Sequence, residues 1–318
     1  MTARSLVRRI VRPNLRFALH LQWKQLRETG LVHWARWNAV LADAWTRDRI
    51  NRSAYTVLSE SEVRSERRSE TVFVFGSGYS LNELSAAAWD HFAAHDTLGF
   101  NAFYHERWLP VRFHLLRGGI YGELRWREFA DEVAAAIRSN PLYDRTIFVM
   151  QDEYFAQFTN QMVGYRLLPA HARVFRYRTA RADGPPTRTL REGLRHTTGT
   201  LADAVNFAYA LGWRHIVLVG VDLYDSRYFY LKPEETLGFD PDSGRLVAAE
   251  RNYWRGQRYD EPHATAGRGV VDLMAEWRET LARDGVRLSV HNPRSLLARV
   301  LPVYPSSATA RSGEAAAR

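Results

Sequence analysis

From Thr71 onward, short apolar segments alternate with longer segments that have the periodicity of amphipathic helices. The apolar segments are rich in β-branched and aromatic residues, as strands are. They lie at 72–75, 97–100, 111–116, 146–150, 216–220 and 286–290, and the main helical patterns lie at 124–139, 198–211 and 270–283. Strands separated by helices form right-handed βαβ units with parallel neighbours. The sequence therefore predicts an α/β fold with one mostly parallel sheet and flanking helices.

A turn with two glycines follows the first of these strands. Gly76-Ser77-Gly78-Tyr79-Ser80 comes directly after the apolar run 71–75, and an alanine-rich helical stretch follows it. Glycine lets the backbone approach a ligand closely, and the free N–H groups at the start of a helix face an anion. Asn101, Arg117 and Asp222 also fall just past strand ends, where parallel sheets bind ligands. This arrangement favours a phosphate or ribose site, although two glycines also occur in ordinary strand-to-helix connections.

Common nucleotide motifs are absent from this turn. Leu81 occupies the position of the third glycine of a dinucleotide fingerprint, and the second strand ends in Asn101 instead of an acidic residue. No lysine follows the glycines, as a P-loop requires. Asp240 and Asp242 resemble the Asp-x-Asp of metal-dependent transferases, but Asp-Pro-Asp-Ser-Gly is also a strong turn sequence. No metal site is predicted.

Residues 1–70 differ in character from the rest of the chain. Basic residues alternate there with leucine, valine and tryptophan; they are Arg4, Arg8, Arg9, Arg12, Arg16, Lys24 and Arg27. The pattern predicts a basic helical extension. It packs on the main domain or a second subunit, or residues 1–50 bind an anionic membrane surface. The charged, serine-rich stretch 59–70 predicts a linker, with the domain boundary at residue 70.

Composition excludes several classes of protein. The 318-residue chain has no cysteine, so disulfide frameworks and thiolate metal sites are excluded. Its net charge of +9 comes mostly from arginine, which suits phosphate and carboxylate ligands. The basic residues are scattered and form no nucleic-acid motif, so no nucleic-acid partner is expected. No spanning segment or signal peptide is recognised, which predicts a cytoplasmic protein, with a peripheral position at the inner membrane left open.

Two later segments, 226–266 and 305–318, complete the predicted domain organisation. Residues 226–266 are aromatic and rich in proline, glycine and charge, and loops of this length in compact domains are usually functional. We expect a lid there, within one domain spanning residues 71–304. The small polar residues 305–318 predict a flexible tail.

The order of the polar blocks resembles one enzyme family. Between about residues 71 and 302 the blocks run in the order Gly76–Leu81, Phe100–Tyr104, Arg195–Gly199, Gly220–Tyr224, His263 and Asn292–Leu297. This ordered set resembles the bacterial sialyltransferases of glycosyltransferase family forty-two. The resemblance implies a single Rossmann-like domain with a lid. It also implies inverting, metal-independent transfer of a CMP-activated acidic sugar, such as sialic acid or Kdo, in the synthesis of lipopolysaccharide or capsule.

The resemblance implies roles for individual residues as well. No cofactor is implied beyond the CMP-sugar donor, and the other partner is a glycan or lipid-linked glycan acceptor. Donor-binding roles fall on Gly76, Ser77, Gly78, Ser80, Asn101, Arg117, Thr197, Thr198, Gly199 and Asp222. Catalytic roles fall on His263, Tyr224 and Arg195, and on one of Tyr228 and Tyr230. The spacing leaves open which of these last two tyrosines contacts the leaving phosphate.

The chemistry of such a transfer suits these residue types. Departure of CMP leaves negative charge on its phosphate, which tyrosine hydroxyls and guanidinium groups stabilise. The acceptor hydroxyl loses a proton as it attacks, and histidine titrates near neutral pH. His263 is the predicted base, with His291 and His196 less well placed. A pterin diphosphokinase-like nucleotide enzyme and a non-catalytic nucleic-acid binder are the alternative functions, and assembly into a homo-oligomer is left open.

Overall fold

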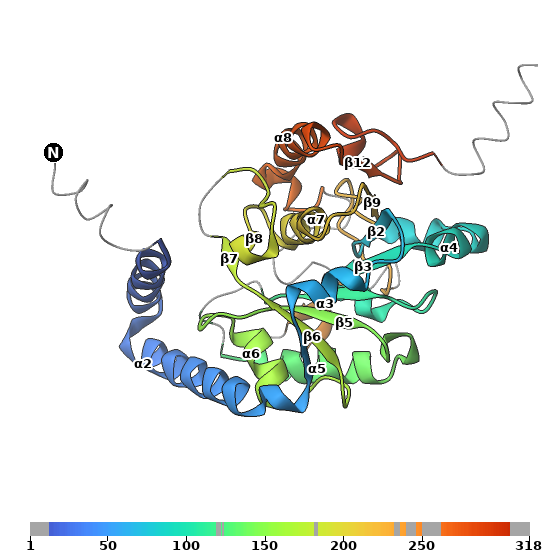
Figure 1. The fold of residues 1–318 in the computed structure, drawn as a ribbon. Helices are drawn as coiled ribbons and strands as arrows, with labels where there is room; N and C mark the ends of the chain where they lie inside the picture. The colour runs from blue at the N-terminus through green and yellow to red at the C-terminus, as the bar shows by residue number, and fades with distance from the viewer. Residues whose placement is uncertain are drawn as a thin grey trace, which may run out of the picture.

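In the computed structural model, the described residues are 13–118, 122, 124–180, 184–231, 236–239, 246–249 and 262–305. They fold around one sheet with helices on both of its faces (Figure 1). The predicted α/β class with a parallel sheet is therefore confirmed.

The central sheet has eight strands, all parallel, in the order β1-β6-β5-β4-β3-β2-β9-β12. The strands are β1 (Thr56–Leu58), β2 (Thr71–Phe75), β3 (Asp96–Phe100), β4 (Phe113–Leu116), β5 (Ile147–Gln151), β6 (Arg173–Tyr177), β9 (His215–Val219) and β12 (Arg287–Val290). From β2 the chain adds strands on one side as far as β6, and then adds β9 and β12 on the other side. The strand order reverses between β2 and β9, and α/β proteins bind ligands at the carboxyl ends of the strands at such a point.

Helices cover both faces of the sheet because its strands are apolar on both sides. In β2, Val72 and Val74 face one core and Phe73 and Phe75 the other, as the alternation of a strand requires. The first core includes α7 (Thr200–Leu211) and α8 (Val270–Arg283). The second includes α4 (Ala86–Ala93), α5 (Trp126–Arg138) and α6 (Gln157–Gly164). In Figure 1, α8 lies at the top of the molecule beside β12, and α5 and α6 lie at the bottom.

The stretch predicted as a linker is part of this domain. It begins directly after β1, which pairs with β6 in the register Thr56↔Arg173. The helix α3 (Glu60–Ser65) follows and is capped by the Ser59 side chain, which accepts a hydrogen bond from the Glu62 amide. Val63 of this helix is fully buried in the core. The linker interpretation is therefore wrong for α3, and β1 places the sheet domain's first strand before residue 70.

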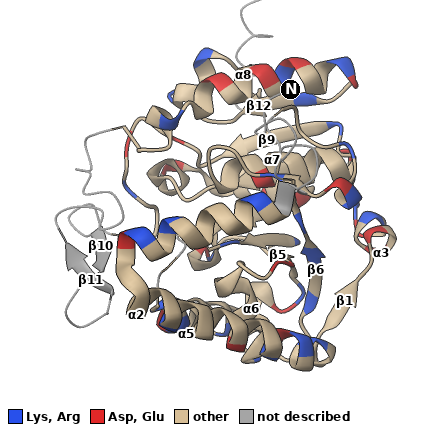
Figure 2. Ribbon diagram, turned by 90° about the vertical axis from the view of Figure 1, so that its left-hand side faces the viewer, with Lys and Arg blue, Asp and Glu red and all other residues tan. Residues whose placement is uncertain are grey.

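The predicted N-terminal helical extension is confirmed as α2 (Pro13–Asn51), which changes direction at Gly30, with φ of 81°. Its second half lies against α6, where Trp37 stacks on Phe155 at 6.1 Å between ring centroids. Asp48 is fully buried and pairs with Arg52 at 2.7 Å, which fixes the end of the helix. In Figure 2, α2 lies across the side of the molecule that faces the viewer. No helix in the described ranges is long and apolar enough to cross a bilayer.

Most of the predicted lid and the predicted tail lie outside the described residues. The two ends of the lid, 226–231 and 262–266, are described. Between them the backbone forms an antiparallel pair, β10 (Thr236–Phe239) with β11 (Leu246–Ala249). The turn predicted at 240–244 also lies outside the described residues.

Candidate functional site

The glycine turn packs directly against the loop that follows β9. Gly76 N–H donates to Val219 O and Gly78 N–H donates to Gly220 O, both at 2.8 Å. A Cβ on Gly76 would lie 2.6 Å from Gly220 O, and one on Gly78 would overlap the Asp222 carboxylate. Only glycine allows the two loops to approach this closely. The structure thus brings the first and fourth of the predicted blocks together at the carboxyl ends of β2 and β9.

The Asp222 carboxylate joins these loops to a third one. It is buried, and it accepts hydrogen bonds from Ser80 N–H at 2.9 Å, from the Ser80 hydroxyl, and from Asn292 Nδ2 at 2.9 Å. Asn292 follows β12, so one side chain ties together the segments after β2, β9 and β12. Asp222 and Ser80, both predicted to bind donor, are bonded to each other and hold the site together.

The backbone of His263 is bonded to Leu223, the residue before Tyr224. His263 N–H donates to Leu223 O at 2.9 Å, so the residue before Tyr224 is bonded to the predicted base. Leu223 has φ of 62°, a conformation that costs a non-glycine residue roughly 1–3 kcal/mol and often occurs at functional sites. The imidazole Nδ1 of His263 accepts a long hydrogen bond, 3.3 Å, from Thr265 N–H. His263 also comes just before α8, whose N-terminus lies at the carboxyl edge of the sheet because its other end leads into β12.

The phenol of Tyr224 is kept neutral by its surroundings. Burial and then the nearby Asp222 carboxylate raise the pKa of Tyr224, while a hydrogen bond with Asn292 and the charge of Arg294 act in the opposite direction. The Arg294 guanidinium lies 5.6 Å from the centre of the Tyr224 ring. A phenol whose pKa lies above its ordinary value is a hydrogen-bond donor at neutral pH.

The remaining tyrosines lie beside the glycine turn. Tyr228 forms an antiparallel bridge with Gly78, and Phe229 N–H donates to Ser77 O at 3.2 Å. Tyr228 and Tyr230 stack at 5.6 Å, and Tyr230 also stacks on His105 at 4.3 Å. Burial lowers the pKa of His105 to about 4, so this ring is neutral. Both Tyr228 and Tyr230 lie in this cluster beside the glycine turn.

The predicted block 195–199 leads directly into α7. Arg195 N–H donates to the Asn206 side chain at 2.8 Å, and its Nε donates to Pro185 O at 3.1 Å. Gly199 precedes the helix with φ of 132°, no side chain caps the helix, and a Cβ there would meet nothing within 4 Å. Thr197 is exposed. Because α7 leads into β9, its N-terminus lies at the same edge of the sheet as the glycine turn, and N–H groups at such an end attract anions.

Arg117 lies deeper than its predicted role requires. Its side chain is 3% exposed and pairs with Asp203 at 2.8 Å, and the same carboxylate contacts His196 Nδ1. Asp203 is fully buried in the first turn of α7. This ion pair therefore joins the end of β4 to the first turn of α7, and much of the charge of Arg117 is balanced within the protein.

Asn101 is exposed at the end of β3 and has φ of 52°. Its carbonyl accepts a hydrogen bond from His114 Nε2 at 3.1 Å, which leaves its side chain at the surface of the same edge. Asparagine is one of the few residues that adopts this backbone conformation readily.

Two hydroxyls at the site are buried and unpaired. The Ser77 Oγ and Thr198 Oγ1 atoms have no hydrogen-bond partner within the described part of the chain. Buried hydroxyls are normally bonded, and an orphaned one at a strand end is a place where a ligand oxygen could complete the bond. Both were predicted to bind donor, one from the glycine turn and one from the start of α7.

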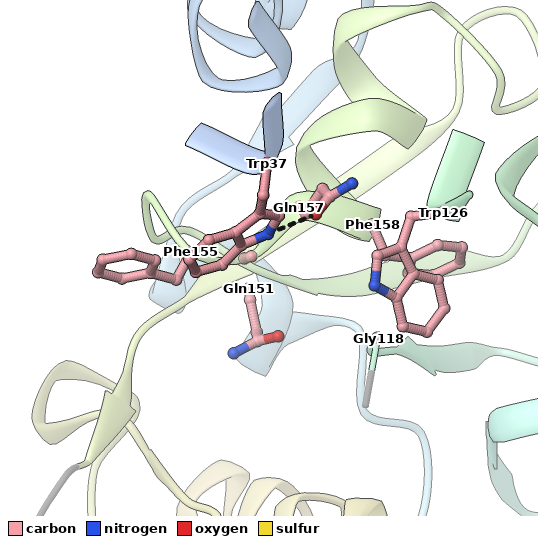
Figure 3. A pocket seen from close by; sticks show the side chains of 8 residues that line it. Trp37, Gly118, Trp126, Gln151, Phe155, Gln157 and Phe158 are labelled. Atoms are coloured by element: carbon pink, nitrogen blue, oxygen red, sulfur yellow. Dashed lines mark hydrogen bonds between the residues drawn. The ribbon is translucent and has the colours of Figure 1, made fainter. Parts of the chain in front are cut away.

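A pocket lies further along the same edge, under α2 (Figure 3). It is lined by Trp37, Gly118, Trp126, Gln151, Phe155, Ala156, Gln157 and Phe158. Trp37 Nε1 donates to Gln157 Oε1 at 3.1 Å across one side. With its amide oxygen turned toward Arg117, Gln151 accepts from that guanidinium at 3.1 Å. No pattern in the sequence predicts this pocket, because its lining residues come from segments far apart in the chain.

Sequence reasoning also passed over Asn292 and Asp203 as members of the site. Asn292 was open to prediction, since it follows an apolar strand directly, whereas Asp203 lies inside a helix that is apolar on nearly every side.

No protein-family model matches the chain. No curated protein matches it either. Within the described residues, no three His, Cys, Asp or Glu side chains form a group that could hold a metal ion.

Proposed function

We propose that the protein is an inverting glycosyltransferase that moves an acidic sugar from a CMP-activated donor to a glycan hydroxyl, without a metal ion. The observation that carries this proposal is that three features lie at one edge of the sheet. These are the glycine turn 76–78, the backbone bond between His263 and the residue before Tyr224, and the hydroxyls of Ser77 and Thr198, which have no partner among the described residues. Together they supply donors for a phosphate beside a base for an alcohol.

In the proposed reaction the bond between the anomeric carbon and the donor's phosphate oxygen breaks as the acceptor oxygen bonds to that carbon. The electron pair leaves with CMP, so negative charge grows on its phosphate. Donors that already point at this position stabilise that charge without reorganisation. We assign this role to the N–H groups at the start of α7, to the Thr198 and Ser77 hydroxyls, and to the neutral phenol of Tyr224.

His263 would take the proton of the acceptor hydroxyl as it attacks. Its present contact, a 3.3 Å hydrogen bond from Thr265 N–H to Nδ1, is at the long end of such bonds. Hydrogen bonds of catalytic groups are often long before substrate binds. Exchange of this contact for the acceptor hydroxyl would place the proton on the imidazole.

The other predicted residues take supporting roles in this proposal. Asn101 is exposed at the end of β3 and contacts the nucleoside, and Arg195 and Thr197 lie at the open start of α7, near the donor's acidic sugar and phosphate. Arg117 acts as a positioning residue, because its ion pair with Asp203 fixes the first turn of α7.

Catalysis by His263 is tested with the variant His263→Ala and CMP-sialic acid and CMP-Kdo as donors, following release of CMP. Loss of a general base lowers kcat by about 10²- to 10⁴-fold, while CMP affinity and the unfolding midpoint stay near those of the wild type. His215→Ala is the matched control, since His215 lies at the opposite, amino-terminal end of β9. Full activity of His263→Ala would overturn the assignment of the base.

The donor class is tested separately by thermal shift and calorimetry. Because a ligand that binds only the folded state raises its apparent stability, CMP should raise the unfolding temperature and GDP, UDP and NAD should not. EDTA should leave this effect unchanged. Binding of ATP that requires magnesium would instead support the diphosphokinase-like alternative, and binding of arbitrary oligonucleotides that weakens with salt would support the nucleic-acid alternative.

A further inference from the structure

The first half of α2 has an apolar stripe that faces away from the protein. Leu15, Leu19 and Trp23 are 52%, 60% and 64% exposed. Their spacing of four residues places them on one face of the helix. The opposite side of the same segment is buried, since Leu21 is only 5% exposed and packs in a small core with Trp37. This part of α2 is therefore apolar on two faces, and the described part of the chain covers only one of them.

Basic residues flank the exposed stripe. At 100° per residue, Arg16, Lys24 and Arg27 follow the stripe around the helix, between it and the buried face. Lys24 and Arg27 each lie 4.0 Å from Glu28, in pairs so exposed that they contribute little. Glu28 is the first acidic residue of the chain, after seven lysines and arginines in residues 1–27. In Figure 2, blue basic residues mark the part of α2 that leads to the N-terminus.

We propose that residues 15–27 of α2 form a membrane-binding face that lies in the headgroup region of a bilayer containing anionic lipids. An exposed apolar stripe with a basic flank is the pattern of helices that lie in this interface. The leucine and tryptophan side chains enter the edge of the hydrocarbon, and the basic side chains reach the headgroup phosphates.

Charge favours a bilayer over a second copy of the chain as the occupant. A symmetric pair of these stripes would bring two basic flanks together, and like charges at an interface are destabilising. One helical stripe also offers less area than the roughly 800 Å² per partner of a standard protein interface. An anionic lipid surface complements both the stripe and its flank.

The position of α2 places this face beside the edge of the sheet where the candidate site opens. His33 Nε2 contacts Gly122 O at 2.7 Å, and Phe17 packs in the small core with Leu124 and Phe155. These contacts are made to the segments that follow β4 and β5, so α2 lies over the carboxyl edge. A protein bound through the stripe would hold this edge next to the bilayer. The membrane face does not depend on the proposed transfer reaction.

The test is co-sedimentation of the full chain with vesicles of phosphatidylcholine alone or with 30% phosphatidylglycerol. The wild type should bind the anionic vesicles and lose binding as salt rises. The double variant Leu19→Glu/Trp23→Glu should bind at least tenfold more weakly, because it removes the apolar insertion and adds negative charge. Lys24→Gln/Arg27→Gln should bind more weakly by about fivefold for each charge removed. Ile50→Glu should bind like the wild type, because Ile50 is 70% exposed at the far end of the same helix.

Two further measurements test how deeply Trp23 enters the bilayer and whether the stripe instead binds a second copy of the chain. Brominated lipids should quench tryptophan fluorescence of the bound wild type, and much of this quenching should be absent in Trp23→Phe. Circular dichroism shows whether each variant is folded. Equal binding of the wild type and Leu19→Glu/Trp23→Glu to anionic vesicles would overturn the proposal. So would a dimer in sedimentation equilibrium that this variant dissociates without any vesicle binding. Vesicle binding needs no donor or turnover, so its failure would leave the transferase proposal standing.

Discussion

Replacing Ser77 and Ser80 by alanine, one at a time, should separate ligand binding from folding within a single turn. The two serines lie three residues apart in the turn after β2. The Ser80 hydroxyl donates to the buried Asp222 carboxylate, whereas the Ser77 hydroxyl is buried without a partner among the described residues. The change to alanine therefore removes a hydrogen bond at Ser80, whereas at Ser77 it removes a hydroxyl that has no hydrogen bond among the described residues.

The expected magnitudes follow from these contacts. A hydrogen bond to a charged acceptor contributes roughly 1.5–3 kcal/mol, so Ser80→Ala should lower the free energy of unfolding by about 2 kcal/mol. Ser77→Ala removes an unsatisfied hydroxyl, so its free energy of unfolding should stay the same or rise slightly. If the Ser77 hydroxyl donates to the CMP phosphate, its loss removes a charge-assisted bond and weakens CMP binding roughly 10-fold or more.

Urea unfolding followed by circular dichroism measures the first quantity, and titration calorimetry with CMP measures the second. The reasoning would be refuted if Ser77→Ala lost as much stability as Ser80→Ala, because the Ser77 hydroxyl would then have a partner in the folded protein. Unchanged CMP affinity of Ser77→Ala would remove this hydroxyl from the proposed phosphate site.

Two further predictions concern the glycine turn and a buried carboxyl group. Gly78→Ala should cost about 3 kcal/mol of stability and abolish CMP binding, because its Cβ would overlap the Asp222 carboxylate; urea unfolding and calorimetry test this against Gly267→Ala, whose Cβ would meet nothing within 4 Å. Burial raises the pKa of Glu106 to about 7 from 4.5, so the folded state keeps a proton that the unfolded chain releases between these values. Stability should therefore fall by up to about 3 kcal/mol as pH rises from 4.5 to 7, and Glu106→Gln should lose this slope in urea unfolding at several pH values, whereas the exposed Glu279→Gln should keep it.

The strands were predictable where apolar residues were continuous or alternated regularly. The predicted run 72–75 became β2 because it is apolar throughout and buried on both faces, and 286–290 became β12 through the alternation of Val286, Leu288 and Val290. β6 was missed because Arg173 and Arg176 interrupt its pattern. Arg176 is nevertheless buried and pairs with Asp48 of α2 at 3.3 Å, so the signal for this strand depends on a contact more than a hundred residues away.

The edge of the sheet that carries the site was predictable, because parallel strands bring their carboxyl ends together. The contacts that the side chains make at this edge were less predictable. Asp222 and Arg117 both follow strands, yet each is bonded to a protein group that the sequence does not mark as its partner, Asn292 in one case and Asp203 in the other. Spacing along a chain gives the edge on which a residue lies, but the choice between a ligand and a protein partner depends on the packing of the loops.

The polar groups at this edge thus divide into two sets with different consequences. Asp222 with Ser80, and Arg117 with Asp203, have partners inside the protein and fix the glycine turn and the start of α7 in place. Among the described residues, the hydroxyls of Ser77 and Thr198 have no partner and no side chain caps the N-terminus of α7. Donors held by a rigid frame can stabilise a developing charge without first reorganising. In such a site, mutations in the first set should act mainly on folding and mutations in the second mainly on ligand binding.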